Sequence, residues 1–351
     1  MAELWNPVII AVLFWGFVNE VITVGEARRF YGLITICGNI AGIVAGQAAG
    51  KFTANVYVSW IPYGKNNWDQ SILFLGCSIM ICSLATLSIF RWMNKRVFSA
   101  SESLKSQPKN TDKQKSSVFG NIMYLARSKY LVCIAAIVVG YNLAMNLIEV
   151  LWKNQIKEAY PNPSDYTAYM GDILTIMGAI STLVAIFFTG SLIRRSWTLA
   201  ALIPVAVILV TGSAFFFFSF SYSVGIQWIG VFFGMTPLML SIVFGSLQQV
   251  MTRACKYTLF DATKEMAFVP LDSKSKYQGK AAIDGLGVQL GKSGGSIVYQ
   301  GVLLMVSTVT ASIPYVGAIF FAVVLIWFFA VLTLGKQFDV LAAEDGRPGI
   351  S

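Results

Sequence analysis

The stretch IDGLGVQLGKSGGSIVYQGVLLMV, residues 283–306, decides the fold class of this chain. It is an apolar run of membrane-spanning length, and Lys292 is its only basic residue. Lys292 follows the polar stretch that ends near Lys280 by about a dozen residues. At about 1.5 Å per helical residue this is roughly 17 Å of depth, close to the middle of a hydrocarbon core of about 30 Å. An unpartnered ammonium there costs about 2.5–3.5 kcal/mol, so its presence indicates a pathway for something negatively charged.

The rest of the chain has the composition of a membrane protein. It is 56% hydrophobic and 12% charged, with a mean hydropathy of +0.65. We therefore expect an all-α polytopic membrane protein with nine membrane-spanning helices. The apolar runs are 5–22, 30–50, 71–90, 131–151, 171–193, 198–220, 226–248, 283–306 and 312–335.

The distribution of basic residues predicts the orientation of these spans. Of the 26 Lys and Arg residues, 21 fall in loops on one side of the alternating topology and four on the other, with Lys292 inside a span. The positive-inside rule then places the C-terminus in the cytoplasm and Met1 outside. The net charge of +9 follows from this topology and the acidic cytoplasmic leaflet. No basic aromatic module points to nucleic acid, so we expect no nucleic-acid partner.

The sequence also argues against an enzyme. Histidine is absent, which excludes His-based acid–base catalysis and His-ligated metals. The five cysteines show no CxxC pairing, so we expect no metal site and no cofactor. The Gly-Lys-Ser at 291–293 is not a P-loop, because position 286, where that motif needs Gly, is Leu286 and no strand precedes it.

One long polar connection, Arg91 to Lys129, divides the spans unequally. Six spans follow it and three precede it, whereas transporters built from two six-helix halves carry such a linker between equal halves, with the substrate site at their interface. We therefore interpret residues 1–90 as the remainder of an N-terminal half, 91–129 as a basic cytoplasmic linker and 130–351 as a six-helix C-terminal half. On this interpretation the chain lacks the first three helices.

The surroundings of Lys292 leave two interpretations open. Gly287, Gly291 and Gly295 form a GxxxGxxxG stripe that allows close helix packing, and a lysine beside it has little steric cover, which suits a phosphate-sized anion. The alternative is an internal ion pair of Lys292 with Glu149 or Asp284. The two are compatible, because a gate can exchange one partner for the other.

Three other polar or helix-breaking residues have plain structural interpretations. Glu149 lies near the outer end of its span, where Trp152 and Lys153 could anchor it at the interface. Asp172 opens the span 171–193 and is expected to cap that helix. Pro237 is expected to kink the helix over 226–248.

Residues 253–296 read RACKYTLFDATKEMAFVPLDSKSKYQGKAAIDGLGVQLGKSGGS. This run resembles the signature region of the non-mitochondrial ATP/ADP translocases of plastids and obligate intracellular bacteria. Further matches occur in the same order along the chain: AELW at 2–5, FWGFVNE at 14–20, EARRFYGL at 26–33, NLIEVLWK at 146–153 and YPNPSDY at 160–166.

The resemblance implies a twelve-helix, major-facilitator-like bundle of which this chain holds helices four to twelve. It carries the family's functional charges over to Glu3, Glu149 and Lys292, while the family's first-helix lysine has no counterpart here. Beside them in the same motifs lie Asn146 and Ser293, and with Asp284 they complete our candidate substrate-binding or coupling residues.

The same resemblance implies the function. It implies exchange of ATP for ADP across an inner membrane, a bacterial one being favoured, by alternating access of the two halves. Two alternatives stay open, a proton-coupled nucleotide importer and an inactive truncated fragment of such a transporter.

Overall fold

The structure, a computed structural model, describes most of the chain. The described residues are 24–53, 60, 64, 66–93, 95, 128–268, 270–271, 279, 282–306 and 308–344. Within these ranges every regular element is a helix, which confirms the all-α prediction. The expected first span, residues 5–22, and residues 96–127 of the expected linker lie outside the described ranges.

The helices follow the order of the expected apolar runs. They are α3 (Val24–Thr53), α4 (Asn67–Met93), α6 (Lys129–Ala159), α7 (Pro163–Arg195), α8 (Trp197–Val224), α9 (Gln227–Phe233), α10 (Pro237–Cys255), η4 (Lys256–Phe260), α11 (Asp261–Ala267), η5 (Ile283–Gly287), α13 (Val288–Val306) and α14 (Val309–Glu344). Elements η4 and η5 are π-helical turns. Five of the described helices, α4, α6, α7, α8 and α14, are long and apolar enough to cross a membrane by length and composition.

Two local expectations were wrong. Helix α7 begins at Pro163, where the Asn162 side chain accepts a hydrogen bond from the Ser164 backbone N–H, so Asp172 lies inside the helix and is not its cap. The run 226–248 is not one kinked helix. Gly234, at φ +66°, ends α9, and Pro237 stands in the first turn of α10, where proline is favoured.

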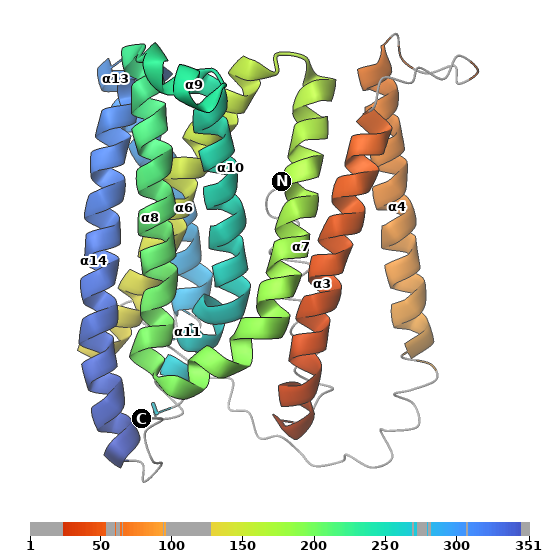
Figure 1. Cartoon of the computed structure of the whole chain (residues 1–351). Coiled ribbons are helices and arrows are strands. Elements are labelled where there is room, and N and C mark those ends of the chain that lie inside the picture. The colour runs from red at the N-terminus through yellow and green to blue at the C-terminus, as the bar shows by residue number, and fades with distance from the viewer. Residues whose placement is uncertain are drawn as a thin grey trace.

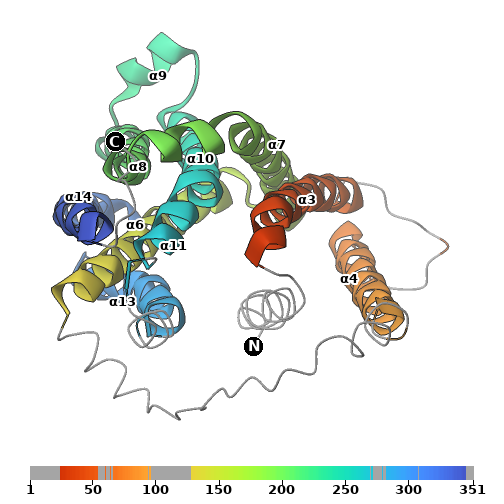
Figure 2. The ribbon, with the colours of Figure 1, turned by 90° about the horizontal axis from the view of Figure 1, so that it is seen from below.

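Helix α6 forms the centre of a bundle with α8, α10, α13 and α14. It packs against α14, α13 and α10, while α8 packs against α10 and α14, as Figures 1 and 2 show. The bundle core is filled by large side chains with no exposure, among them Phe215, Phe320, Trp327 and Ile148. A network of buried side chains also joins α6, α8 and α10. Gln155 and Ser241 each hydrogen-bond Ser219, and the Ser241 hydroxyl donates to the side-chain Oε1 of Gln155 at 2.6 Å.

Helices α3 and α4 extend the structure on the other side of α7 (Figure 2). Helices α3 and α7 cross at two glycines. A Cβ on Gly46 would stand 2.5 Å from the Gly171 carbonyl oxygen, and one on Gly171 would stand 2.7 Å from the Gly46 carbonyl oxygen. Only glycine allows two backbones to approach so closely, and the contact places the helices on either side of the linker against each other.

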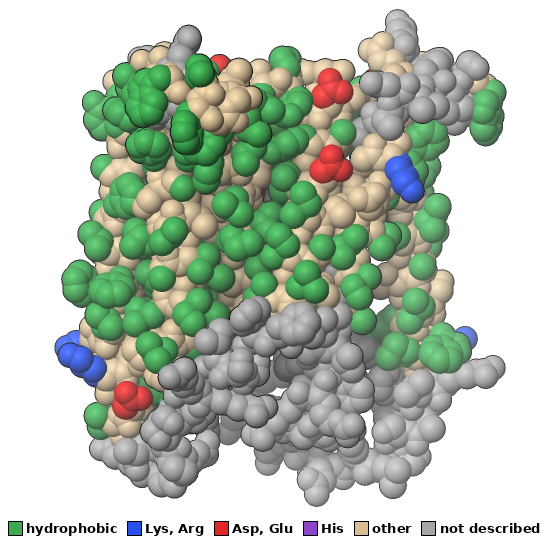
Figure 3. Space-filling view, viewed as in Figure 1, with side chains coloured by type: hydrophobic (Ala, Val, Ile, Leu, Met, Phe, Trp, Pro, Cys, Tyr) green, Lys and Arg blue, Asp and Glu red, His purple; other side chains and the backbone are tan. Residues whose placement is uncertain are grey.

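The outer faces of the helices have the character expected in lipid. The most apolar window of α4 has no buried residue, and large exposed side chains such as Ile79, Ile81 and Leu84 line it. Figure 3 shows apolar side chains over most of the described surface of one face, with charged side chains toward its two ends. This pattern fits a bilayer in which hydrocarbon replaces water around the middle of each helix.

The two ends of the bundle are distinguished by their contacts. At one end, here called the linker end, the Tyr130 hydroxyl donates to the Ala267 carbonyl at 2.7 Å and the Trp197 indole donates to the Thr263 carbonyl at 3.0 Å. At the opposite end, the Tyr222 hydroxyl donates to Glu158. The linker end therefore holds the starts of α6 and α8 together with all of α11.

Candidate functional site

Helix α13 packs on α6 through its glycines. A Cβ on Gly291 would lie 2.5 Å from the Asn142 Cβ and 3.0 Å from the Val139 carbonyl oxygen, and one on Gly295 would lie 2.5 Å from Asn146 Oδ1. Both glycines are buried. Gly287 is less tightly placed, since its nearest neighbours are at 3.8 Å or more. The structure thus supports packing as the role of this stripe.

Lys292 lies beside the glycine face but points away from the packing contact. At about 100° per residue, Gln289, Lys292, Ser296 and Gln300 fall within one sector of about 80° of the helix surface. Lys292, Gln289 and Gln300 are exposed, and Ser296 is half-buried. A different sector, with Leu290, Ile297 and Leu304, is exposed and apolar. The helix therefore presents a packing face, a polar face and an apolar face, and only the polar face suits water or a charged solute.

Neither of the carboxylates expected as an alternative partner contacts Lys292. Glu149 Oε1 lies 2.6 Å from Lys153 Nζ, and Asp284 Oδ1 lies 2.8 Å from Lys264 Nζ. Within the described part of the chain, Lys292 Nζ has no ion pair. No carboxylate of the described residues therefore offsets the charge of the Lys292 ammonium.

The packing of α13 on α6 explains why Glu149 does not reach Lys292. Gly291 lies against Asn142 and Gly295 against Asn146, so the two helices run parallel and in step. Lys292 is then level with Leu143, and Glu149 lies six residues, or about 9 Å, further along the axis. Glu149 is half-buried on the same helix, and its pairing with Lys153 agrees with the interfacial interpretation of this carboxylate.

Two of the other candidate residues lie close to Lys292. Asn146 accepts a hydrogen bond from the Ser296 hydroxyl at 3.3 Å, so it contacts the polar face of α13 one turn beyond Lys292. Ser293 is exposed and follows Lys292 directly. Glu3 lies outside the described residues. The structure therefore brings Lys292, Asn146 and Ser293 into one region and places Glu149 about 9 Å away along the bundle axis.

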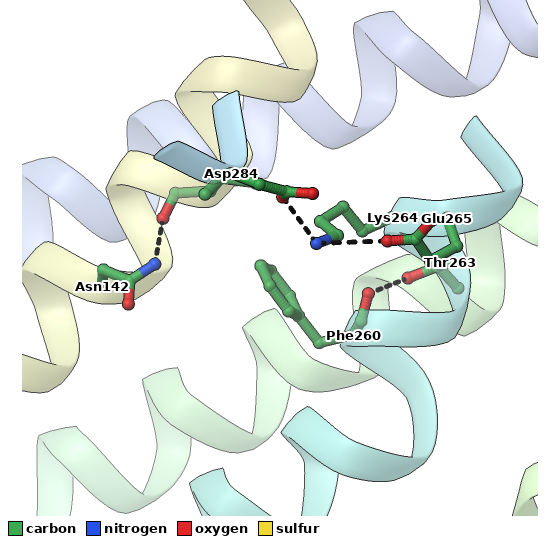
Figure 4. A network of polar contacts seen from close by, with 7 residues as sticks. Asn142, Phe260, Thr263, Lys264, Glu265 and Asp284 are labelled. Carbon is green, nitrogen blue, oxygen red and sulfur yellow. Dashed lines mark hydrogen bonds and ion pairs between the residues drawn. The ribbon is translucent and has the colours of Figure 1, made fainter. Parts of the chain in front are cut away.

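Asp284 belongs to a separate cluster at the linker end (Figure 4). Lys264 on α11 contacts Asp284 Oδ1 at 2.8 Å and Glu265 Oε1 at 3.4 Å, and its side chain is only 14% exposed. Burial lowers the pKa of Lys264, but the two carboxylates raise it more, so the net pKa lies above the usual lysine range. Lys264 is a residue that the sequence analysis missed, because nothing in the spacing of residues 264 and 284 shows that their helices meet.

Residues 1–338 match the family model described as TLC ATP/ADP transporter. The chain is 36% identical over 368 residues to "ADP,ATP carrier protein 1" of Chlamydia pneumoniae, a match that covers 100% of this chain and 70% of the relative. It is 37% identical over 359 residues to the protein of the same name from Chlamydia trachomatis serovar D, covering 99% of this chain and 65% of the relative.

A plastid relative matches equally far along this chain. "ADP,ATP carrier protein 1, chloroplastic" of Arabidopsis thaliana is 35% identical over 349 residues, which cover 98% of this chain and 54% of the relative. The chain thus spans from about half to seven-tenths of the length of these three relatives. No solved structure matches it.

Proposed function

Because this chain belongs to the TLC ATP/ADP transporter family, we propose that it exchanges ATP for ADP across a membrane by alternating access. The family consists of carriers and not of enzymes, and its relatives are named for ADP and ATP. In such a mechanism two helical halves rock around a central site. We assign α3 and α4, with residues 1–90, to one half and residues 130–351 to the other, and the close α3–α7 crossing supports a contact between them.

The observation that carries this proposal is the unpaired ammonium of Lys292. It stands on the polar face of α13, with no ion pair among the described residues and with hydroxyl and amide groups of Ser296 and Asn146 one turn away. A lysine at membrane depth is unfavourable unless an anion or water receives it. A nucleotide polyphosphate supplies both the charge and the acceptor oxygens, so Lys292 binds the substrate phosphates.

Glu149 is the proposed gate or coupling residue, together with Glu3. Glu149 forms an ion pair with Lys153, whose side chain is 43% exposed, and such a pair contributes little free energy, so Glu149 can change partners at little energetic cost. Binding of a polyphosphate at Lys292 would alter the field at Glu149, about 9 Å along the bundle. This differential interaction is what a ligand needs in order to shift a carrier between two states.

The test is uptake of labelled ATP by vesicles that contain the purified chain and are preloaded with ADP. We expect saturable uptake that requires the preload, and we expect Lys292→Ala to remove it. Gln300→Ala is the matched control, since Gln300 lies on the same face about 12 Å further along α13. Uptake and nucleotide affinity unchanged by Lys292→Ala would contradict the assignment of the site.

The second candidate function is proton-coupled nucleotide import. The half-buried position of Glu149 in the long apolar helix α6 favours it, because ionisable residues within membrane spans mark ion and proton pathways. Uptake that persists without preload and collapses with an uncoupler would establish symport. Uptake that follows the preload and ignores the uncoupler would establish exchange.

We also propose that the membrane is a bacterial inner membrane and that the linker end faces the cytoplasm. The support is the concentration of Lys and Arg in the sequence between the spans at that end, by the positive-inside rule. A cysteine introduced in residues 96–127 should react with an impermeant reagent only after the cells are opened. Reaction on intact cells would reverse the orientation.

A further inference from the structure

The ion pair at the linker end connects α11 with η5, and its two residues are 20 positions apart in the sequence. Lys264 Nζ lies 2.8 Å from Asp284 Oδ1 and donates a hydrogen bond to that oxygen. Figure 4 shows the Lys264 side chain reaching from α11 toward η5, with Glu265 on its other side. The two side chains are 14% and 32% exposed, so water screens this pair less than a pair at the surface.

Both partners stand next to a π-helical turn. η4 (Lys256–Phe260) ends four residues before Lys264, and η5 (Ile283–Gly287) contains Asp284. A π-helical turn interrupts the regular hydrogen-bond register of a helix and occurs frequently at functional sites. The ion pair therefore connects η5 with α11, the short helix that directly follows the other π-helical turn.

Asp284 and Lys292 lie on one continuous helical segment, eight residues or about 12 Å apart along the axis. Between them the helix contacts α6 through Gly291, which has no side chain to interlock with its neighbour. A contact made by glycine permits close approach but supplies no side chain that fixes rotation of one helix over the other. The position of Lys292 then depends on the side-chain contacts on either side of this crossing, which are the Ser296–Asn146 hydrogen bond beyond Lys292 and the Lys264–Asp284 ion pair at the linker end.

We propose that Lys264 and Asp284 are positioning residues, which fix the rotation and axial position of α13 and thereby hold the Lys292 ammonium where it meets the substrate. The inference rests on the proposed function and deepens it. It also changes the expected role of Asp284, from a group that binds substrate or couples directly to one that acts through Lys264.

Lys264 is not itself a second phosphate site. Its ammonium already contacts two carboxylates, and its side chain is largely buried. A polyphosphate would have to displace both carboxylates and would meet their negative charge at short range, which is unfavourable. The cluster is therefore a structural contact between helices, and its influence on the substrate is exerted through α13.

The test compares three ways of changing the pair in the uptake assay. Lys264→Asp and Asp284→Lys each place like charges together, and we expect each to raise the KM for ATP at least about tenfold, which corresponds to about 1.4 kcal/mol. The double charge exchange, Lys264→Asp with Asp284→Lys, restores an ion pair and should bring the KM back to within about threefold of the parent.

A neutral double variant separates positioning from folding. Breaking one partner of a buried pair can unfold a protein, but replacing both by apolar residues of similar size is often tolerated. Lys264→Met with Asp284→Leu should therefore keep the thermal stability of the detergent-solubilised protein while its KM rises about tenfold. A KM equal to that of the parent in this neutral variant would overturn the inference, and so would a failure of the charge exchange to restore the KM in a folded protein.

The matched control is Lys336→Met. Lys336 is an exposed lysine in the last third of α14, and it forms no ion pair in the described part of the chain. Its replacement should leave the KM unchanged. Failure of the proposed function looks different, because the parent chain would then take up no nucleotide. If the parent transports and Lys292→Ala abolishes uptake while the neutral pair behaves normally, only the positioning role is wrong.

Discussion

Lys264 and Lys292 belong to the same helical bundle and have opposite surroundings. Lys264 contacts two carboxylates and is largely buried, whereas Lys292 is exposed on the polar face of α13 and has no ion pair among the described residues. A lysine whose charge is already balanced can hold helices together but has nothing left for a solute. A lysine left unbalanced at membrane depth is stable only when water or a ligand receives it.

The difference between the two lysines comes from the helix that faces each of them. Lys264 faces Asp284 on η5, a residue 20 positions later in the sequence. Lys292 has the glycine contact with α6 on one side and uncharged polar groups along its own face. Partner geometry, and not lysine itself, therefore separates a structural cation from a binding cation in this chain.

The comparison breaks if Lys292 is given a carboxylate of its own. Gln289→Glu changes an exposed amide, three residues before Lys292 on the polar face, into a carboxylate of the same shape. The new charge would pair with Lys292 and compete with the substrate phosphates, so we expect the KM for ATP to rise at least about tenfold. Uptake kinetics in preloaded vesicles measure this effect.

Gln300→Glu provides the control for this change. It is the same substitution on the same face, but it lies about 12 Å from Lys292 along the helix and should change the KM by less than about threefold. Equal effects of the two substitutions would mean that negative charge anywhere along α13 weakens uptake. Lys292 would then not be the specific binding site for the substrate phosphates.

The next largest effect concerns the packing of α13 against α6 at Gly295. Gly295→Ala puts a Cβ 2.5 Å from Asn146 Oδ1 and 2.8 Å from Asn146 Cβ, so α13 must move away from α6. We expect a loss of about 1–3 kcal/mol of stability, as for other overpacked sites. Thermal unfolding of the solubilised protein measures it.

The neighbouring glycine gives the opposite expectation. A Cβ on Gly294 meets only Leu143 Cδ1, at 3.9 Å, so Gly294→Ala removes a flexible residue without a clash. It should leave the stability unchanged or raise it by up to about 1 kcal/mol. If both alanines destabilise equally, the packing face of α13 is not where the structure places it.

These residues also show how far sequence reasoning reaches. The apolar runs predict the described long helices in order, because a span depends on local composition alone. The start of α7 was missed, since the cap at Asn162 precedes the apolar run by nine residues. The two parts of the 226–248 run were merged because apolar content hides the left-handed turn at Gly234.

The site was harder to predict than the spans. The sequence places Asp284 near a span, among the candidate substrate-binding or coupling residues, but it does not show that Lys264, 20 residues earlier, reaches this carboxylate. The sequence allows an ion pair of Glu149 with Lys292, but the parallel packing of α6 and α13 offsets the two residues by about 9 Å along the helix axis. In each case the missing information was the register of two helices, which their separate patterns do not contain.

The smallest expected effect concerns Glu149–Lys153, which like Lys264–Asp284 is an ion pair of a lysine with a carboxylate at short distance. Lys153 Nζ lies 2.6 Å from Glu149 Oε1, a shorter distance than that of the linker-end pair, yet Lys153 is 43% exposed and both residues are on one helix. Exposed pairs four residues apart on a helix contribute about 0.3–0.5 kcal/mol, because water screens them and neither side chain is otherwise fixed. Lys153→Met should therefore change the unfolding free energy by less than about 1 kcal/mol and the KM by less than about twofold.

Under the same conditions Lys264→Met, which leaves Asp284 half-buried and unpaired, should lower the unfolding free energy and raise the KM far more. If the two single substitutions prove equally mild, the linker-end pair is no more than a surface contact, because burial between two helices is what distinguishes it from Glu149–Lys153.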